Sequence, residues 1–143
     1  SAGVKMIVDQ LLNNSANVKT LVLSSNPGIG DAGTKHLARL IQVNRSITEL
    51  ALHNTGITDH SVHILANILC DAHNGLPPIL QKLYISFNRS ITDESVPVLL
   101  KIIEQSRKLQ VLAVQNCGLS IRARQQLKHT SKAKNKNKFN LAV

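Results

Sequence analysis

The sequence is short of aromatic residues, and this shortage limits the kinds of module that it can form. Of its 143 residues 2% are aromatic, from one Tyr, two Phe and no Trp, whereas 43% are hydrophobic. The core must therefore consist of Leu, Ile, Val and Ala, and modules that stack nucleic-acid bases on aromatic platforms are disfavoured. The length and the charged fraction of 17% suit one globular domain or one uninterrupted array.

Long apolar runs are missing as well. Lys101 stops the run Val98-Leu99-Leu100, far below the roughly 18 residues that a membrane helix needs. Asp9 and Gln10 interrupt the stretch Met6-Ile7-Val8, so the chain shows no signal-peptide core. We therefore expect a soluble protein.

Cysteine is scarce too. Cys70 and Cys117 are too few for a disulfide scaffold, and their spacing does not fit a zinc module. A reducing compartment is the default for such a chain, and we expect a cytoplasmic protein. The sequence predicts neither a bound metal nor a cofactor.

Positive charge is concentrated at the carboxyl end. Residues 1–120 hold 10 Lys and Arg against 8 Asp and Glu, whereas residues 121–143 hold 7 Lys and Arg and no acid. The basic segment contains Lys128, Lys132, Lys134, Lys136 and Lys138. Because these lysines stand among Asn, Ser and Thr, we expect a solvated loop. The functional alternative is an anionic partner, either nucleic acid or an acidic membrane surface.

An internal repeat organises the chain. Segments that start at Val18, Ile47, Leu80 and Leu109 share apolar residues at their first, fourth and sixth positions. The fourth-position residues are Leu21, Leu50, Leu83 and Leu112, separated by 29, 33 and 29 positions, and Leu141 follows after another 29. Each segment predicts a β-strand, and a fifth strand is expected over 139–143.

Helices are predicted between these strands. Apolar residues follow each strand at helical spacing, and a further helix is expected before the first strand, at about 4–12. Thr58-Asp59 and Thr92-Asp93 suit helix amino termini, and Gly30-Asp31 occupies the same columns. The fourth repeat departs from this pattern, because it carries Ser120-Ile121-Arg122 there.

This pattern resembles the leucine-rich repeat family, in particular its ribonuclease-inhibitor-like class with long strand-plus-helix repeats. The resemblance covers almost the whole chain and implies an α/β fold. The expected fold is a right-handed superhelical solenoid with a curved parallel sheet on the concave face and helices on the convex face. The resemblance also implies that Asn26, Thr55, Asn88 and Cys117 hydrogen-bond to backbone in the turn that leaves each strand.

The repeats define the expected domain organisation. We expect one leucine-rich repeat domain over residues 1–143, made of a partial repeat (1–17), four repeats (18–46, 47–79, 80–108, 109–137) and a terminal strand (138–143).

A glycine-rich segment offers a competing interpretation. Gly28-Ile29-Gly30-Asp31-Ala32-Gly33 fits the Gly-x-Gly-x-x-Gly fingerprint of dinucleotide-binding domains, after a predicted strand and before a helix, with Glu49 further on. However, the corresponding residues 57–61 of the next repeat contain no glycine. Turn and cap residues of one repeat therefore explain the segment better.

Signals of catalysis or metal binding are weak. His60 and His63 lie on one predicted helix, with His53 and His73 elsewhere, but nothing in the spacing makes them converge on a metal. Asp59, His60 and Ser61 are residue types of a catalytic triad, yet adjacent residues on a helix point in different directions. We therefore expect a protein that is not an enzyme.

The concave sheet face remains as the candidate binding surface, because strand side chains alternate between the two faces. Its fifth-position column is an apolar stripe with Tyr84 in the middle, and Phe87 lies one step beyond the strand. The expected partner-binding residues are Val22, Glu49, Ala51, His53, Lys82, Tyr84, Ser86, Phe87, Val111, Ala113 and Gln115. For Phe87, packing over the turn and partner contact are equally good explanations.

The sequence therefore predicts a non-catalytic protein-interaction module that binds a protein partner on its concave face. Family members include inhibitors, immune receptors and bacterial effectors, so we expect either an effector, which would work in the host cytoplasm, or a fragment of a larger recognition protein. The alternatives are a regulator of a small GTPase or other enzyme, and binding of nucleic acid or acidic lipid through the basic segment. The terminal strand offers an edge for self-association.

Overall fold

The chain alternates helices and strands throughout. The computed structural model describes residues 1–14, 17–70, 75–134 and 138–143. Its elements are α1 (Ala2–Asn13), β1 (Thr20–Val22), α2 (Gly30–Val43), β2 (Glu49–Ala51), α3 (Asp59–Cys70), β3 (Lys82–Tyr84), the 3-10 turn η1 (Asp93–Ser95), α4 (Val96–Gln105), β4 (Val111–Ala113), α5 (Ile121–Lys134) and β5 (Asn140–Ala142). The predicted strands, the helix before the first strand and the strand at the carboxyl end are all confirmed.

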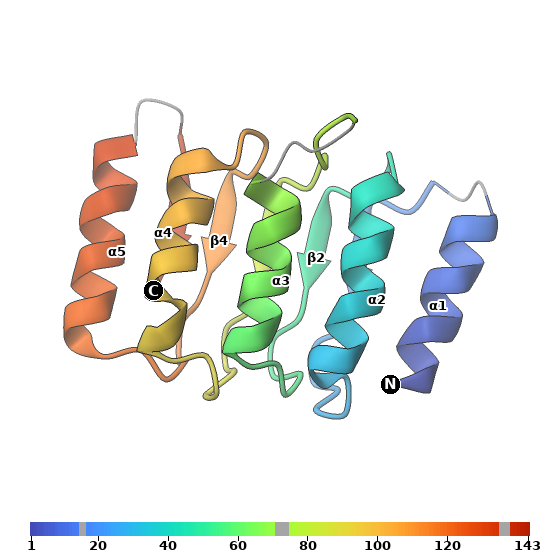
Figure 1. Cartoon of the computed structure of the whole chain (residues 1–143), viewed down its shortest axis with the longest axis horizontal. Helices are drawn as coiled ribbons and strands as arrows, with labels where there is room; N and C mark the ends of the chain where they lie inside the picture. Colours follow the sequence, from blue (N-terminus) through green and yellow to red (C-terminus); the bar gives the residue numbers. More distant parts are fainter. Residues whose placement is uncertain (15–16, 71–74, 135–137) are drawn as a thin grey trace.

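The five strands form one parallel sheet in sequence order, with β1 and β5 at its edges. Equivalent repeat positions pair directly, so that Leu21 faces Leu50, Leu50 faces Leu83, Leu83 faces Leu112 and Leu112 faces Leu141. This register follows from the repeat, because each unit packs the same apolar positions against the next. Figure 1 shows the helices in one row from α1 to α5.

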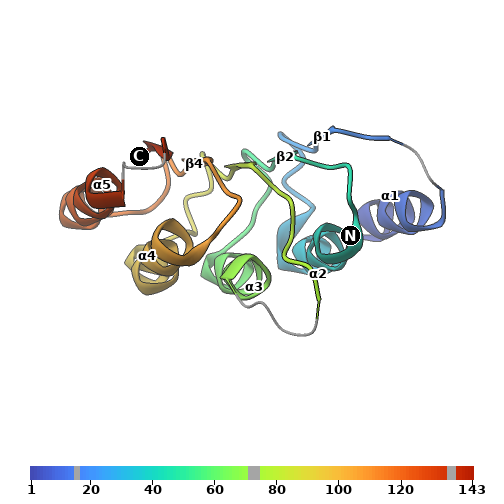
Figure 2. The ribbon, with the colours of Figure 1, turned by 90° about the horizontal axis from the view of Figure 1, so that it is seen from above.

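The core lies between the sheet and the helices. Viewed from above, the helices cover one side of the sheet and leave the other side uncovered (Figure 2). The fourth-position residues Leu50, Leu83 and Leu112 are fully buried. The helices add aliphatic side chains such as Leu65 and Leu99, which are also fully buried. This is the predicted α/β leucine-rich repeat solenoid.

The turns that leave the strands are held by side chains at the ninth repeat position. Asn26 donates to the carbonyl of Leu23 at 2.8 Å, and Thr55 Oγ1 donates to the carbonyl of Leu52 at 2.8 Å. Asn88 donates to three carbonyls, two of its own repeat and one of the preceding repeat, and accepts from the amide of Thr55 at 2.9 Å. Side chains at this position, exposed in Asn26 and buried in Thr55 and Asn88, thus satisfy backbone groups that the strands leave unpaired.

A ladder of aspartates joins the starts of successive helices. Asp31 accepts from the amide and hydroxyl of Thr58 at 3.0 and 2.7 Å, and also from Ser61. One repeat later, Asp59 accepts from the amide and hydroxyl of Thr92 at 2.8 and 2.7 Å. Each carboxylate lies in the first turn of its own helix and therefore fixes the amino end of the next helix along the chain.

The ladder reaches the fourth repeat, where the sequence predicted a departure. Asp93 accepts from the amide of Ser120 at 2.8 Å, and Ser120 Oγ accepts from the amide of Ala123 at 3.1 Å. Ser120 therefore caps α5 in place of the expected Thr-Asp pair. The column of ladder aspartates ends there, because Ile121 has no carboxylate.

The solvated loop predicted for the basic segment is wrong for its first part. Lys128, Lys132 and Lys134 lie within α5, whose buried side comprises Ala123, Leu127 and Ser131. These three residues are spaced by four, so they form one stripe against the core although two of them are small. Lys138 is exposed and follows the helix, whereas Lys136 lies outside the described residues.

Candidate protein-binding surface

The expected binding residues line up across the uncovered face of the sheet. Tyr84 pairs with Ala51 on one side and with Ala113 on the other, in the strand register. Both alanines are nearly buried, at 7% and 5% exposure, whereas Val22 at the end of the row is 64% exposed. Tyr84 therefore stands between two small residues, and its side chain is half-buried.

Three rings gather at the carboxyl end of β2 and β3, and we call His53, Tyr84 and Phe87 the aromatic cluster. The ring centroids of His53 and Tyr84 are 5.6 Å apart with a tilted arrangement. Those of His53 and Phe87 are 6.2 Å apart, edge to face. Such tilted and edge-to-face contacts are the favourable geometries for neighbouring rings. His53 thus connects the two aromatic residues that the sequence analysis singled out.

Phe87 has a backbone conformation that its side chain disfavours. Its φ is 62°, and the equivalent residues of the other repeats, Ser25, Asn54 and Asn116, share this left-handed geometry at 63°, 51° and 54°. Asn adopts it readily, whereas a bulky residue there costs about 1–2 kcal/mol. Phe87 is nevertheless 56% exposed, so burial offsets this strain only in part.

His53 carries an unusual polar atom at the centre of the cluster. Its Nδ1 atom is buried, and no partner lies within hydrogen-bonding distance among the residues that the structure describes. The backbone amide of His53 donates to Ser24 Oγ at 3.1 Å, which ties the start of the turn to the neighbouring repeat. The ring itself is held by its contacts with Tyr84 and Phe87.

Charged residues border the cluster along the third-position row. Glu49 and Lys82 are paired in the strand register, and their charged groups lie 3.9 Å apart. Both side chains are partly exposed, so the ion pair contributes at most about 1 kcal/mol. The arrangement places polar groups beside an aromatic centre, as in protein interfaces with an apolar centre and a polar rim.

Ser86, one of the expected partner-binding residues, serves the fold more than the surface, and Cys117, expected in a turn, contacts backbone. Ser86 is 1% exposed, and its hydroxyl accepts from the amide of Gln115 at 2.9 Å. Cys117 donates from Sγ to the carbonyl of Ile85 at 3.4 Å. Burial raises the pKa of the Cys117 thiol, which disfavours the reactive thiolate.

Among the described residues, the histidines singled out in the sequence do not converge on a metal site. No group of three or more His, Cys, Asp or Glu suited to a metal occurs among the described residues, and His73 lies outside them. Nδ1 of His63 contacts its own helix at the carbonyl of Asp59, 2.8 Å away. The Ser61 hydroxyl hydrogen-bonds to Asp31 and to Thr34, and neither of these hydrogen bonds involves a histidine.

The glycine-rich segment 28–33 is part of a repeat. Asp31, within it, is engaged by Thr58 and Ser61 of the next repeat. Gly30 has a φ of +56°, and its amide donates to the carbonyl of Thr55 at 2.9 Å. These contacts explain the segment as an inter-repeat turn. In the described part of the chain, no helix has the length and apolar character needed to cross a membrane.

Comparisons with known proteins agree with this geometry. A family model described as "Leucine Rich repeat" matches residues 14–38. A structure entitled "Leiomodin-1 Actin-Binding Site 2 (ABS2)" is similar with a TM-score of 0.77 and 17% identity, covering 94% of this chain and 75% of that one. The tropomodulin C-terminal domain of Caenorhabditis elegans is similar with a TM-score of 0.55 and 13% identity, covering 93% of each chain. No curated protein matches the sequence.

These likenesses and the repeat register lead to the same assignment. The ribonuclease-inhibitor-like subclass stays a prediction, because neither similar structure bears that name. With its repeated sequence pattern, its in-register parallel sheet and a family model that matches residues 14–38, the chain has a leucine-rich repeat fold.

Proposed function

We propose that this chain is a non-catalytic protein-interaction module that binds a protein partner on its concave face, with the aromatic cluster as the anchor. One observation carries the proposal: Phe87 is 56% exposed in a left-handed backbone position where two other repeats have Asn. Strained residues that the fold does not require tend to lie at functional sites. A large exposed ring kept at such a cost is explained by contact with a partner.

The surroundings of the cluster suit a binding hot spot. Aromatic residues dominate binding energy at the centre of protein interfaces, where less energetic neighbours exclude water from them. Tyr84 and Phe87 would supply this apolar centre, and Glu49 and Lys82 would supply polar contacts at its border. The buried Nδ1 of His53 adds a polar group that a partner would cover further.

The first partner to test is actin. The similar leiomodin-1 structure is named as an actin-binding site, and it shares the fold over 94% of this chain. Two other roles, a bacterial effector and a regulator of a small GTPase, would use the same kind of surface, and the identity of the bound protein separates them. The edge strand β5 offers self-association as a further outcome.

The experiment compares three variants with the wild type in binding to purified actin and in capture from lysate. Phe87→Asn uses the residue found in two other repeats, Tyr84→Ala removes the central ring, and Met6→Asn changes a 70% exposed apolar residue on α1 as the control. Circular dichroism first establishes that all variants are folded.

We expect both cluster variants to lose the same partner and the control to keep it. A hot-spot residue contributes about 2 kcal/mol or more, so the dissociation constant should rise at least about thirtyfold. Equal binding by Phe87→Asn and the wild type would remove the cluster from the interface. Failure with actin, together with cluster-dependent capture of another protein, would replace actin as the partner.

A further inference from the structure

The net charge of the molecule lies entirely at one end of the array. Residues 1–100 contain seven Lys and Arg and seven Asp and Glu, so this part is neutral. Residues 101–143 contain ten Lys and Arg and one acid, Glu104, which accounts for the whole net charge of +9. This end includes β4, α5 and β5, and β4 pairs with β3, which carries Tyr84 of the aromatic cluster.

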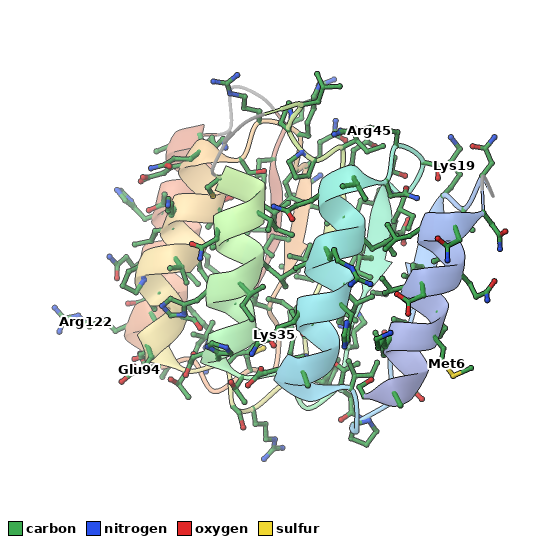
Figure 3. All side chains as sticks on the ribbon, turned by 45° about the vertical axis from the view of Figure 1, so that its right-hand side comes forward. Met6, Lys19, Lys35, Arg45, Glu94 and Arg122 are labelled. Atoms are coloured by element: carbon green, nitrogen blue, oxygen red, sulfur yellow. The ribbon has the colours of Figure 1, made fainter. Side chains whose placement is uncertain are left out.

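Helix α5 presents much of this charge on its outer face. Arg124, Lys128 and Lys132 are exposed and follow one another at intervals of four residues. This spacing places them in one stripe, about 6 Å apart along the helix axis. No carboxylate lies within 4.0 Å of these cations in the described part of the chain. Arg122, labelled in Figure 3, extends away from the ribbon at the same end.

The cations in the first turn of α5 work against the helix. The first turns of α2 and α3 carry Asp31 and Asp59, whereas the first turn of α5 contains no acid and carries Arg122 and Arg124. Cations at a helix amino terminus are disfavoured by the helix dipole. Like charges four residues apart also repel. A sequence that accepts both costs in one helix points to an anionic partner.

A groove beside α5 extends the basic surface. It has a volume of about 570 Å³, and its lining includes Arg107, Lys108, Lys134 and the single acid Glu104. Lys134 spans its side, because Nζ donates to the carbonyl of Ser106 at 3.3 Å and lies 5.6 Å from the centre of the Phe139 ring. Cations of the turn after α4 and of the end of α5 therefore line the same groove.

We propose that this surface, the outer face of α5 with Arg107 and Lys108, binds the phosphate backbone of a nucleic acid without reading the bases. A row of evenly spaced cations complements a row of phosphates. The residues between the cations, Gln125, Gln126 and His129, are exposed and polar. They suit phosphate and sugar contacts, and no aromatic platform for bases accompanies them.

A membrane fits this surface less well. Helices that lie in a membrane surface insert an apolar face into the lipid. In α5 the apolar residues Ala123 and Leu127 are already buried against the core, and Ile121 is the one large exposed apolar residue of the helix. Nucleic-acid binding here goes beyond the proposed protein binding on the concave face and is independent of it.

The test measures binding of the full chain to a fluorescent mixed-sequence oligonucleotide, single-stranded and duplex, by anisotropy at several salt concentrations. For the wild type, we expect a dissociation constant of about 10⁻⁶ to 10⁻⁴ M at physiological salt. The logarithm of the binding constant should fall linearly with the logarithm of salt concentration, with a slope of about −0.9 per phosphate contact on duplex. A wild type that shows no binding to either oligonucleotide overturns the proposal.

Two triple variants of equal net charge separate the local surface from overall charge. Arg124→Gln/Lys128→Gln/Lys132→Gln removes the stripe, and its slope on duplex should be smaller in magnitude by about 3. The control Lys19→Gln/Lys35→Gln/Arg89→Gln removes three exposed cations from the neutral part, and we expect it to keep the wild-type slope. Equal loss in both variants would mean binding to net charge alone and would overturn the assignment.

Vesicles provide the second arm. The wild type is added to phosphatidylcholine vesicles with and without phosphatidylserine. Binding to the acidic vesicles without binding to either oligonucleotide would assign the surface to a membrane and overturn the proposal. Circular dichroism checks the variants, and Arg107→Gln/Lys108→Gln replaces the stripe variant if that variant fails to fold, with an expected slope change of about 2.

Discussion

The aspartate ladder predicts that a single carboxylate stabilises the junction between two repeats. Asp59 accepts hydrogen bonds from the amide and hydroxyl of Thr92 and from the hydroxyl of Ser95. Asp59→Ala removes all three hydrogen bonds at once. Because Ser95 is fully buried, its hydroxyl cannot form a replacement hydrogen bond with water.

The expected change in the free energy of unfolding follows from the hydrogen-bonding groups that Asp59→Ala leaves unpaired. Leaving a buried hydrogen-bonding group unsatisfied costs about 1–3 kcal/mol. Losing the contacts that fix a helix amino terminus costs about 1 kcal/mol more. We therefore expect Asp59→Ala to lower the free energy of unfolding by about 2–4 kcal/mol, a large part of the roughly 5–15 kcal/mol that stabilises a typical domain.

Urea unfolding followed by circular dichroism measures this change. The control is Asp9→Ala, which removes a carboxylate of α1 that pairs with Lys5 and Arg39, both at 2.7 Å. Both cations are exposed and the carboxylate is partly exposed, so the control should cost less than Asp59→Ala. If Asp59→Ala costs no more than Asp9→Ala, the inter-repeat role of the ladder is refuted.

Acid titration of the same proteins gives a second readout. Burial, the largest influence, raises the pKa of Asp59, but the hydrogen bonds from Ser95 and Thr92 together outweigh it and hold the pKa below its ordinary value of 3.8. A group with a lowered pKa stabilises the fold above its ordinary pKa, and this stability is lost as the pH falls through the folded value. Wild-type stability should therefore drop below about pH 4, and Asp59→Ala should lose less over that range.

Three further measurements test the turns. Phe87→Asn should change the free energy of unfolding by less than about 1 kcal/mol, because relief of about 1–2 kcal/mol of left-handed strain offsets the lost burial of less than half of the ring. A cost of about 3 kcal/mol in urea unfolding would make Phe87 a core residue instead. Gly56→Ala should lower the melting temperature, because φ is +72° and the added Cβ would lie 2.4 Å from the carbonyl oxygen of Pro27, whereas Gly28→Ala, with open space around it, should not. Cys117 should react with a thiol reagent in the folded protein more slowly than in the unfolded one, because burial raises its pKa; equal rates would contradict its packed position.

The strands were predictable because the same apolar positions recur in every repeat and pack in the same way. The intervals between Leu21, Leu50, Leu83, Leu112 and Leu141 fix the register of a parallel sheet before any coordinate is known. Helix α5 escaped prediction in part because composition outweighed spacing: lysines among Asn, Ser and Thr concealed the buried stripe of Ala123, Leu127 and Ser131. Two small residues provide a weak apolar signal, yet both are buried.

The candidate site was predictable only as a set of positions. Alternation placed Tyr84 on the concave face, but the ring contacts of His53 depend on side-chain directions that a linear pattern does not contain. One signal was available and unused: Asn54 and Asn116 occupy the column of Phe87, and Asn favours left-handed backbone. The reach of each aspartate into the next repeat likewise depends on how the repeats stack.

The uneven distribution of charge makes the molecule an electric dipole along the array. Its neutral repeats and its cationic end create a field that turns the molecule during an encounter, so a negatively charged body meets α5 first. At physiological salt this field decays over about 8 Å, so the turning takes place only in the last step of approach. Added salt would therefore slow the association of a negatively charged protein with the concave face, while the rate of its dissociation from that face would change little.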